Sequence, residues 1–231
     1  MSVLGKGLLG QAFCAAYPDS ERVIIAAGVS NSLETDLSEF RREETLVKKA
    51  IDTGKELAYF STCSLLGAKA TPYTEHKARM EELIGSNAVG FSIFRLPQVV
   101  GVVRNNTLVS FFIGKLVASD TLRIQESALR YLIAVEDVVR LAGSLWDSGL
   151  SRNKTVNIAP SHAISALLIA RTLKAMLGSS SRIETIPGGD SYQAPTPELS
   201  ALLEPSDPIL SERYAESVLA RYAHKIASLY T

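Results

Sequence analysis

Tyr73 and Lys77 are the residues whose types and spacing point most directly to chemistry. They stand four positions apart in TPYTEHK, at the start of an expected helix, so their side chains share one helical face. An ammonium group beside a phenol favours the phenolate, the form that exchanges protons near neutral pH. The pair alone also fits an exposed Tyr and Lys on a solvated helix surface.

A group of hydroxyl residues precedes this pair by about ten positions. Ser61, Thr62 and Ser64 lie in YFSTCSLLG, where an expected strand ends, and Cys63 stands among them. Side chains at the carboxyl end of a parallel strand face the ligand crevice of an open α/β sheet. A hydroxyl cluster there, directly before a Tyr/Lys helix, favours a catalytic site over a coincidence.

A third pattern is the glycine spacing of Gly5, Gly7 and Gly10, which reads G-x-G-x-x-G between a short strand and a helix. In a dinucleotide-binding turn the first glycine permits the tight bend. The second lets the backbone approach a pyrophosphate, and the third lets helix and strand pack closely. The helix N-terminus then offers N–H groups to the anion. Glycines also serve ordinary turns, so the motif depends on its neighbours.

Strands and helices alternate along the chain, which is what could bring these three patterns to one edge of a sheet. ERVIIAAG is continuously apolar, as expected of a buried parallel strand. We expect further strands in 3–4, 56–64, 88–101, 129–135, 154–160 and 181–189, and helices in 8–17, 33–54, 71–86, 107–118, 135–149, 161–178 and 211–230. This order predicts a doubly wound, Rossmann-like parallel sheet that binds ligands at the carboxyl ends of its strands.

The 231 residues predict a single domain. We expect a core over about 1–150 and a smaller C-terminal lobe over about 151–231, with the strand Lys154–Pro160 returning to the core. The 24 basic and 24 acidic residues give no net field that would attract nucleic acid or an anionic membrane.

Two isolated cysteines form neither a disulfide framework nor a metal site, and the three histidines are scattered. No apolar run is long enough to span a bilayer. The glycines of the N-terminal stretch fit a strand–turn–helix better than a signal peptide. We therefore expect a cytoplasmic protein without a metal.

Taken in order, these motifs resemble the short-chain dehydrogenase/reductase superfamily, in particular its extended branch of nucleotide-sugar epimerases and dehydratases. The matching stretches cover nearly the whole chain: GKGLLG, VIIAAG, YFSTCSLLG, YTEHK, FRLPQVVG, LRYLIAVEDVVRLA and NIAPSHAISALLIARTLKAMLG. The ordered set is far more specific than any one of them.

The resemblance implies a role for each matching position. Tyr73 would be the acid/base, Lys77 would tune it while holding the nicotinamide ribose, and Thr62 or Cys63 would hydrogen-bond the substrate. The cofactor, NAD or NADP, would lie against Gly5, Lys6, Gly7, Leu8, Leu9, Gly10, Ala27, Gly28, Ser61, Lys77, Leu96 and Pro97. The substrate would contact Ser30, Asn31, Ser64, Gln98 and Arg130, whose planar guanidinium suits a diphosphate. A structural role for Arg130, and turn-forming roles for Ser30 and Asn31, remain alternatives.

Three departures from the family pattern stand out. The glycine turn is one residue shorter than Gly-x-x-Gly-x-x-Gly, and Cys63, a weak donor, stands where the catalytic Ser or Thr is expected. The third departure is that only residues 11 to 22 separate Gly10 from VIIAAG, which lacks an acidic residue for the adenosine ribose. VIIAAG is either the second strand without that residue or the family's fourth strand with two strands deleted. We favour the fourth, which predicts a narrower sheet.

The resemblance implies an NAD(P)-dependent epimerase, dehydratase or reductase of a nucleotide sugar. Polysaccharide synthesis (O-antigen or capsule) is a role that it suggests for such an enzyme. The resemblance also implies a homodimer through the helices Thr35–Gly54 and Tyr73–Gly85. The alternative is a non-catalytic binding protein on a degraded reductase scaffold, which the trimmed strands and Cys63 favour. A reductase of a non-sugar carbonyl is a third possibility.

Overall fold

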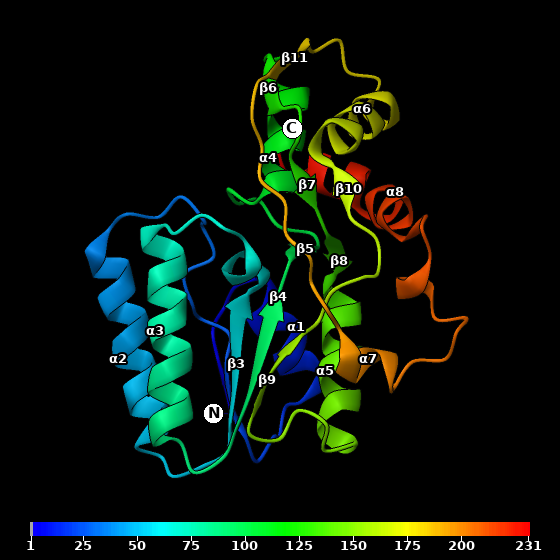
Figure 1. Cartoon of the computed structure of the whole chain (residues 1–231). Coiled ribbons are helices and arrows are strands. Elements are labelled where there is room, and N and C mark those ends of the chain that lie inside the picture. The colour runs from blue at the N-terminus through cyan, green and yellow to red at the C-terminus, as the bar shows by residue number, and fades with distance from the viewer. Residues whose placement is uncertain (1) are drawn as a thin grey trace. The chain divides into compact units, whose positions relative to one another are not determined.

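The computed structural model describes residues 2–231, which form two compact units (Figure 1). Residues 2–96, 135–158 and 194–203 form the first, called here the sheet unit. Residues 97–134, 159–193 and 204–231 form the second unit.

The sheet unit is built on five parallel strands in the order β1-β2-β3-β4-β9. They are β1 (Val3–Leu4), β2 (Val23–Ile25), β3 (Leu57–Thr62), β4 (Phe91–Leu96) and β9 (Lys154–Asn157). Every residue of β2 and β3 is buried, as expected of strands covered by helices on both faces. The predicted fold class, a trimmed Rossmann-like parallel sheet, is confirmed.

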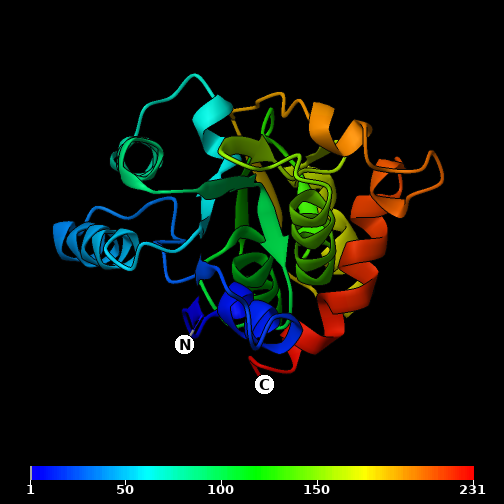
Figure 2. The same cartoon turned by 90° about the horizontal axis from the view of Figure 1, so that it is seen from below.

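Alternate side chains of the strands pack against two helix layers (Figure 2). On one face, Leu57 and Tyr59 join the core of α2 (Leu37–Ile51) and α3 (Pro72–Asn87). On the other face, Phe60 lies 4.7 Å from Phe13 of α1 (Leu8–Ala16), ring centre to ring centre. Trp146 of α5 (Val135–Asp147) lies 6.0 Å from the same ring, so α1 and α5 share this face.

The position of β2 decides between the two interpretations of VIIAAG. In the usual doubly wound order, the second strand lies on one side of the first and the fourth strand on the other. Here β1 lies at the edge of the sheet within residues 2–231, and every later strand of the sheet lies on the β2 side of it, as expected if β2 takes the place of the fourth strand. Within residues 2–231 no further strand flanks β1, so the sheet is narrower on that side.

The β1–α1–β2 crossover has an unusual handedness. The crossovers through α1, α2 and α3 all step in the same direction across the sheet, but α1 lies on the opposite face from α2 and α3. The β1–α1–β2 crossover therefore has the opposite hand to the next two. Because about 98% of such crossovers are right-handed, we assign the left hand to β1–α1–β2.

The second unit contains three two-stranded sheets and three helices. Its strands are paired as β5 (Gln98–Val100) with β8 (Leu132–Ala134), β6 (Leu122–Gln125) with β11 (Ile183–Ile186), and β7 (Leu129–Arg130) with β10 (Ile164–Ser165). Its three α-helices are α4 (Leu108–Val117), α6 (Ala166–Leu177) and α8 (Tyr214–Ala227). A short 3-10 turn, η2 (Pro208–Leu210), precedes α8. A further short helix, α7 (Pro197–Ser200), belongs to the sheet unit.

Within residues 2–231 no helix is both long and apolar enough to cross a membrane. In the same part of the chain, no three His, Cys, Asp or Glu side chains are grouped to hold a metal ion.

Candidate functional site

Tyr73 and Lys77 lie in the first turns of α3, which begins beside the carboxyl end of β3. Thr71 caps the helix by accepting a hydrogen bond from Thr74 N at 3.2 Å, and Thr74 Oγ1 accepts one from Thr71 N in return. This capping box and Pro72 fix the start of the helix. The sequence therefore sets the positions of Tyr73 and Lys77 locally, and both side chains are buried.

The Lys77 ammonium has no hydrogen left for a ligand in this arrangement. Its Nζ donates to Glu43 Oε1 at 2.8 Å, to Tyr59 OH at 3.1 Å and to the Phe60 carbonyl at 3.4 Å. An ammonium group has three hydrogens, and these three partners account for all of them. Lys77 can hold a ribose hydroxyl only after it gives up one of these bonds.

Glu43 of α2 is the centre of this network and has no exposed surface. Its carboxylate accepts from Val29 N at 2.7 Å, Tyr59 OH at 2.6 Å, His76 Nε2 at 3.0 Å and Lys77 Nζ at 2.8 Å. Burial opposes ionisation of Glu43. The Lys77 charge and the hydrogen bonds from His76, Lys77 and Tyr59 outweigh that effect and hold its pKa well below the ordinary 4.5.

The network leaves no room for a side chain at Gly28. A β-carbon there would stand 2.5 Å from Glu43 Oε1 and 2.7 Å from Lys77 Nζ. Gly28 therefore lets the buried ion pair pack closely, and its contact with a cofactor stays a prediction.

Tyr73 lies beside this ion pair but is packed as a core residue. It is 7% exposed and clusters with Val29 and Phe40, and Lys77 Nζ lies 6.0 Å from the centre of its ring. Since Glu43 neutralises Lys77 at 2.8 Å, little net positive field reaches the phenol. Tyr73 and Lys77 are close to each other, as their spacing predicts. Their spacing does not reveal the Glu43 carboxylate, which neutralises the charge of Lys77.

Sequence reasoning missed Glu43, although a signal was present. Phe40, Glu43, Val47 and Ala50 follow one another at helical spacing and form the buried face of α2. An acidic residue on an apolar helix face requires a buried partner, and Lys77 is that partner. His76, stacked on Phe40 at 4.7 Å, was also treated as isolated.

The hydroxyl and thiol side chains at the end of β3 make different interactions. Thr62 Oγ1 accepts from Ser64 N at 3.1 Å and caps the short turn η1 (Cys63–Leu66). Cys63 is fully buried, and its thiol donates to the Arg95 carbonyl at 3.3 Å. Burial raises the pKa of the Cys63 thiol to about 12. Ser61 Oγ is buried and has no partner among residues 2–231, so it can still bond a ligand.

The glycine turn has the geometry that its spacing predicts. Gly5 has φ +143°, and a β-carbon there would overlap the Ala26 carbonyl; one on Gly10 would overlap the Gly5 carbonyl. Around Gly7, which caps α1 without a side-chain hydrogen bond, a β-carbon would meet nothing within 4 Å. A side chain at Gly7 would therefore meet open space where α1 begins, and the first N–H groups of a helix have no partner within the helix.

Two residues of the loop after β2, Ala27 and Asn31, make hydrogen bonds within the protein that the sequence did not predict. Asn31 Oδ1 accepts from Leu33 N at 3.1 Å as a turn former, and the Ala27 carbonyl accepts from Arg42 at 3.0 Å. Ser30 is exposed. The contact of Ser30 with a substrate stays a prediction.

The remaining predicted residues fall in different parts of the chain. Leu96 ends β4, is buried and pairs with Thr62 across the sheet. Pro97, Gln98 and Arg130 belong to the second unit. Arg130 donates to Asp190 Oδ1 at 2.6 Å and to the Asp190 carbonyl at 3.0 Å, so a phosphate would have to compete with this carboxylate.

Comparison with known proteins gives a fold and no sequence relative. No protein-family model matches the chain, and neither does any curated protein sequence. Among solved structures, a UDP-N-acetylglucosamine 4-epimerase from Methanobrevibacter ruminantium, in complex with UDP-N-acetylmuramic acid, is similar over 93% of this chain and 79% of its own, with a TM-score of 0.74 and 14% identity.

Two further structures are similar to the same extent. RMD from Pseudomonas aeruginosa, complexed with NADPH, has a TM-score of 0.74, 13% identity and 98% coverage of both chains. A dTDP-glucose 4,6-dehydratase from Bacillus anthracis, in complex with NAD, has a TM-score of 0.70 and 14% identity over 98% of this chain and 82% of its own. This chain has the fold of nucleotide-sugar epimerases and dehydratases.

Proposed function

We propose that this protein is an NAD(P)-dependent enzyme that epimerises, dehydrates or reduces a nucleotide sugar. The observation that carries the proposal is the glycine turn, because the open space at Gly7, where α1 begins, suits a pyrophosphate at the same sheet edge as Tyr73. The similar structures in complex with NAD, NADPH or a UDP-sugar support it.

The cofactor would supply hydride transfer at a sugar carbon. In this proposal Tyr73 OH exchanges a proton with the sugar hydroxyl, and Lys77, once released from Glu43, holds the nicotinamide ribose. Ser61, whose buried hydroxyl has no partner among residues 2–231, is better placed to bond a ligand than Cys63. Arg130 would grip the diphosphate after exchanging its bond to Asp190.

A second candidate is a nucleotide-binding protein without turnover. The saturated hydrogen bonds of Lys77 favour it, because a lysine held at 2.8 Å by Glu43 serves the fold without further roles. The sheet, which ends at β1 within residues 2–231, favours it too, since less of the protein remains to hold an adenosine.

Titration with NADH and NADPH, followed by nicotinamide fluorescence, tests the proposal and separates the two candidates. We expect saturable binding of one cofactor. Tyr73→Phe should then keep that affinity and lose turnover of a sugar nucleotide. No binding at millimolar cofactor would refute the redox function, and turnover unchanged by Tyr73→Phe would remove Tyr73 from the proton path.

The sugar nucleotide is the finer part of the proposal, together with a place in polysaccharide synthesis in the cytoplasm. UDP-, GDP- and dTDP-sugars should be compared by their effect on the melting temperature. A shift with one of them identifies the nucleotide. Turnover without any shift would instead favour a reductase of a non-sugar carbonyl. We also propose a homodimer formed through α2 and α3.

A further inference from the structure

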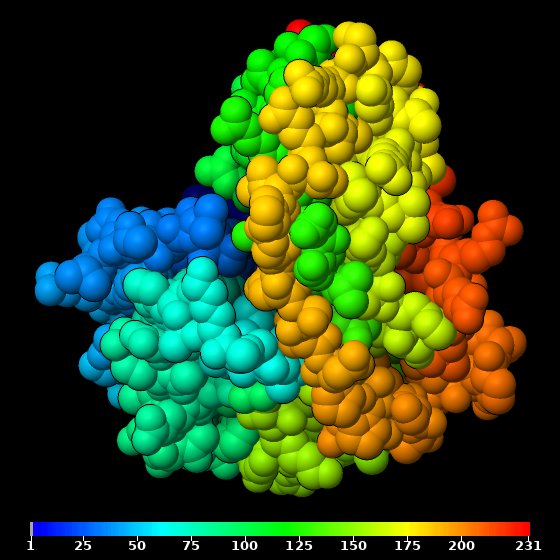
Figure 3. All heavy atoms as spheres, turned by 45° about the horizontal axis from the view of Figure 1, so that its top comes forward, coloured from blue at the N-terminus to red at the C-terminus, as the bar shows by residue number. Residues whose placement is uncertain are grey.

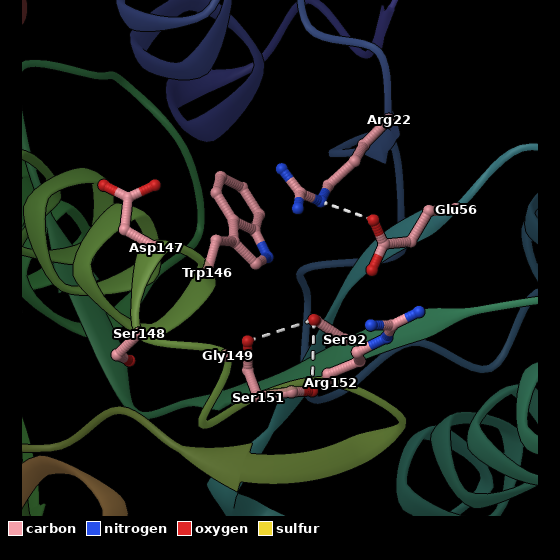
Figure 4. A pocket seen from close by; sticks show the side chains of 9 residues that line it. All are labelled: Arg22, Glu56, Ser92, Trp146, Asp147, Ser148, Gly149, Ser151 and Arg152. Atoms are coloured by element: carbon pink, nitrogen blue, oxygen red, sulfur yellow. Dashed lines mark hydrogen bonds and ion pairs between the residues drawn. The ribbon is translucent and has the colours of Figure 1, made fainter.

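A polar pocket of about 380 Å³ lies at the amino edge of the sheet, opposite the edge that carries the glycine turn and Tyr73 (Figure 4). Its lining comes from the residues that enter the strands: Arg22 precedes β2, Glu56 precedes β3, Ser92 lies at the start of β4, and Arg152 lies two residues before β9. The C-terminal end of α5 closes the remaining side with Trp146. All these residues belong to the sheet unit.

Trp146 provides an unused hydrogen-bond donor in this pocket. The residue is 8% exposed, and its Nε1 is buried without a partner among residues 2–231. Figure 4 shows the nitrogen on the side of the indole that faces Arg22 and Ser92. An indole N–H can only donate, and a buried donor without an acceptor costs about 1–3 kcal/mol. An acceptor atom placed beside Trp146 in the pocket would therefore be favourable.

The charges around this donor leave a cation in excess. Arg22 Nε lies 2.9 Å from Glu56 Oε2, and its guanidinium lies over the Trp146 ring at 5.5 Å. The backbone N–H of Arg152 donates to the Gly149 carbonyl at 3.2 Å, but its guanidinium has no hydrogen bond or ion pair within residues 2–231. The Asp147 carboxylate points away from Ser92 and the indole nitrogen in Figure 4. With Glu56 matched to Arg22, the exposed guanidinium of Arg152 is left without a carboxylate partner and can pair with an anion.

The two serine hydroxyls that line the pocket beside β4 and β9 already make hydrogen bonds within the protein. Ser92 Oγ donates to the Ser151 carbonyl at 3.1 Å, and Ser151 Oγ donates to the Leu145 carbonyl at 3.2 Å. Both hydroxyls donate their hydrogens to carbonyl groups of the protein, so they are not available as donors to a ligand. The unmatched groups that remain are donors.

We propose that this pocket is a second ligand site, which binds a small oxyanion, a carboxylate or a phosphate, between Trp146 Nε1, Arg152 and the free N–H groups of Arg22. A planar guanidinium pairs with such an anion through two parallel hydrogen bonds, and the indole N–H supplies a third. The volume admits a group larger than a few water molecules. The site is independent of the proposed nucleotide-sugar chemistry, which takes place at the other edge of the sheet.

The chain carries its own reporter for this site, because Trp146 is its single tryptophan. Tryptophan fluorescence should be followed during titration with inorganic phosphate, with acetate and with chloride, at constant ionic strength. We expect a saturable change with phosphate or acetate and none with chloride. The stronger of the two identifies the oxyanion. No saturable change with either, or an equal change with chloride, would overturn the proposal.

Two arginine variants make the test specific. Arg152→Gln removes the cation that faces the pocket and should weaken binding at least tenfold. Arg41→Gln removes the same charge from the exposed side of α2 in the same unit and should leave the affinity unchanged. Equal affinity in Arg152→Gln and the unmodified protein would show that the fluorescence change does not arise in this pocket. Trp146→Phe, read by calorimetry, should also lose affinity.

Discussion

Glu43 stabilises the sheet unit through four hydrogen bonds and a buried charge pair, so its substitution should be costly. Glu43→Gln would leave the Lys77 ammonium buried without a counter-charge and should lower the free energy of unfolding by about 3 kcal/mol. Glu44→Gln is the matched control, because Glu44 pairs with Lys48 on the surface and should cost less than about 0.5 kcal/mol. Denaturant unfolding measures both. Equal losses would show that the buried pair contributes nothing special.

The same carboxylate predicts how stability depends on pH. The pKa of Glu43 is lowered in the folded protein, although burial opposes this, because Lys77 and the surrounding donors favour the charged form. Its stabilising contribution is therefore complete above the ordinary pKa of 4.5 and declines as the pH falls below that value. The free energy of unfolding of Glu43→Gln should fall less steeply in this acid range. Parallel acid profiles of the two proteins would contradict the prediction.

The two cysteines should differ sharply in reactivity. Cys63 is buried and its pKa is raised to about 12, whereas Cys14 is exposed on α1. Since the thiolate is the nucleophile, a thiol reagent at pH 8 should label one cysteine in the native protein and both in denaturant. Cys14→Ser should abolish the native labelling. Rapid native labelling of Cys14→Ser would show that Cys63 is accessible and reactive in the folded protein.

At the scale of elements, two glycines of the β1–α1 turn should differ in role: Gly10 should affect stability, and Gly7 should affect cofactor binding. Gly10→Ala would drive a methyl group into the Gly5 carbonyl and should destabilise the protein by about 1–3 kcal/mol. Gly7→Ala meets open space and should change stability little, but it should weaken NADH or NADPH binding by crowding the pyrophosphate position. Thermal unfolding and cofactor titration measure the two effects. Loss of stability in Gly7→Ala, or unchanged affinity, would contradict this assignment.

The elements were predictable where a local signal exists. Continuous apolar runs located β2 and β3, and the Thr-Pro start located α3. Strand β6 was missed, since its four residues alternate between buried and exposed and lie in a stretch without apolar continuity. The left-handed β1–α1–β2 crossover has no local signature at all, because it follows from which strand β1 pairs with. For the same reason Glu43 could not be matched to Lys77, 34 positions away, from spacing alone.

At the scale of the whole molecule, the net charge of zero leaves association to particular surfaces. The outer faces of α2 and α3 lie at the surface in Figure 3, and Leu37 at the start of α2 is 63% exposed. If the proposed dimer forms there, Leu37→Asp should dissociate it, because it places a charge in the contact. Leu168→Asp on α6, where the leucine is 45% exposed, is the matched control and should leave the dimer intact.

Sedimentation velocity over a range of protein concentrations decides this prediction. The unmodified protein and Leu168→Asp should sediment as dimers, and Leu37→Asp as a monomer. The two helices carry charged residues of both signs, including Arg41 and Glu44 of α2 and Arg79 and Glu82 of α3. If opposite charges on these helices meet across the proposed contact, added salt should weaken the dimer. A monomer at every concentration would remove the dimer from the proposal, and a dimer that survives Leu37→Asp would place its interface on another surface.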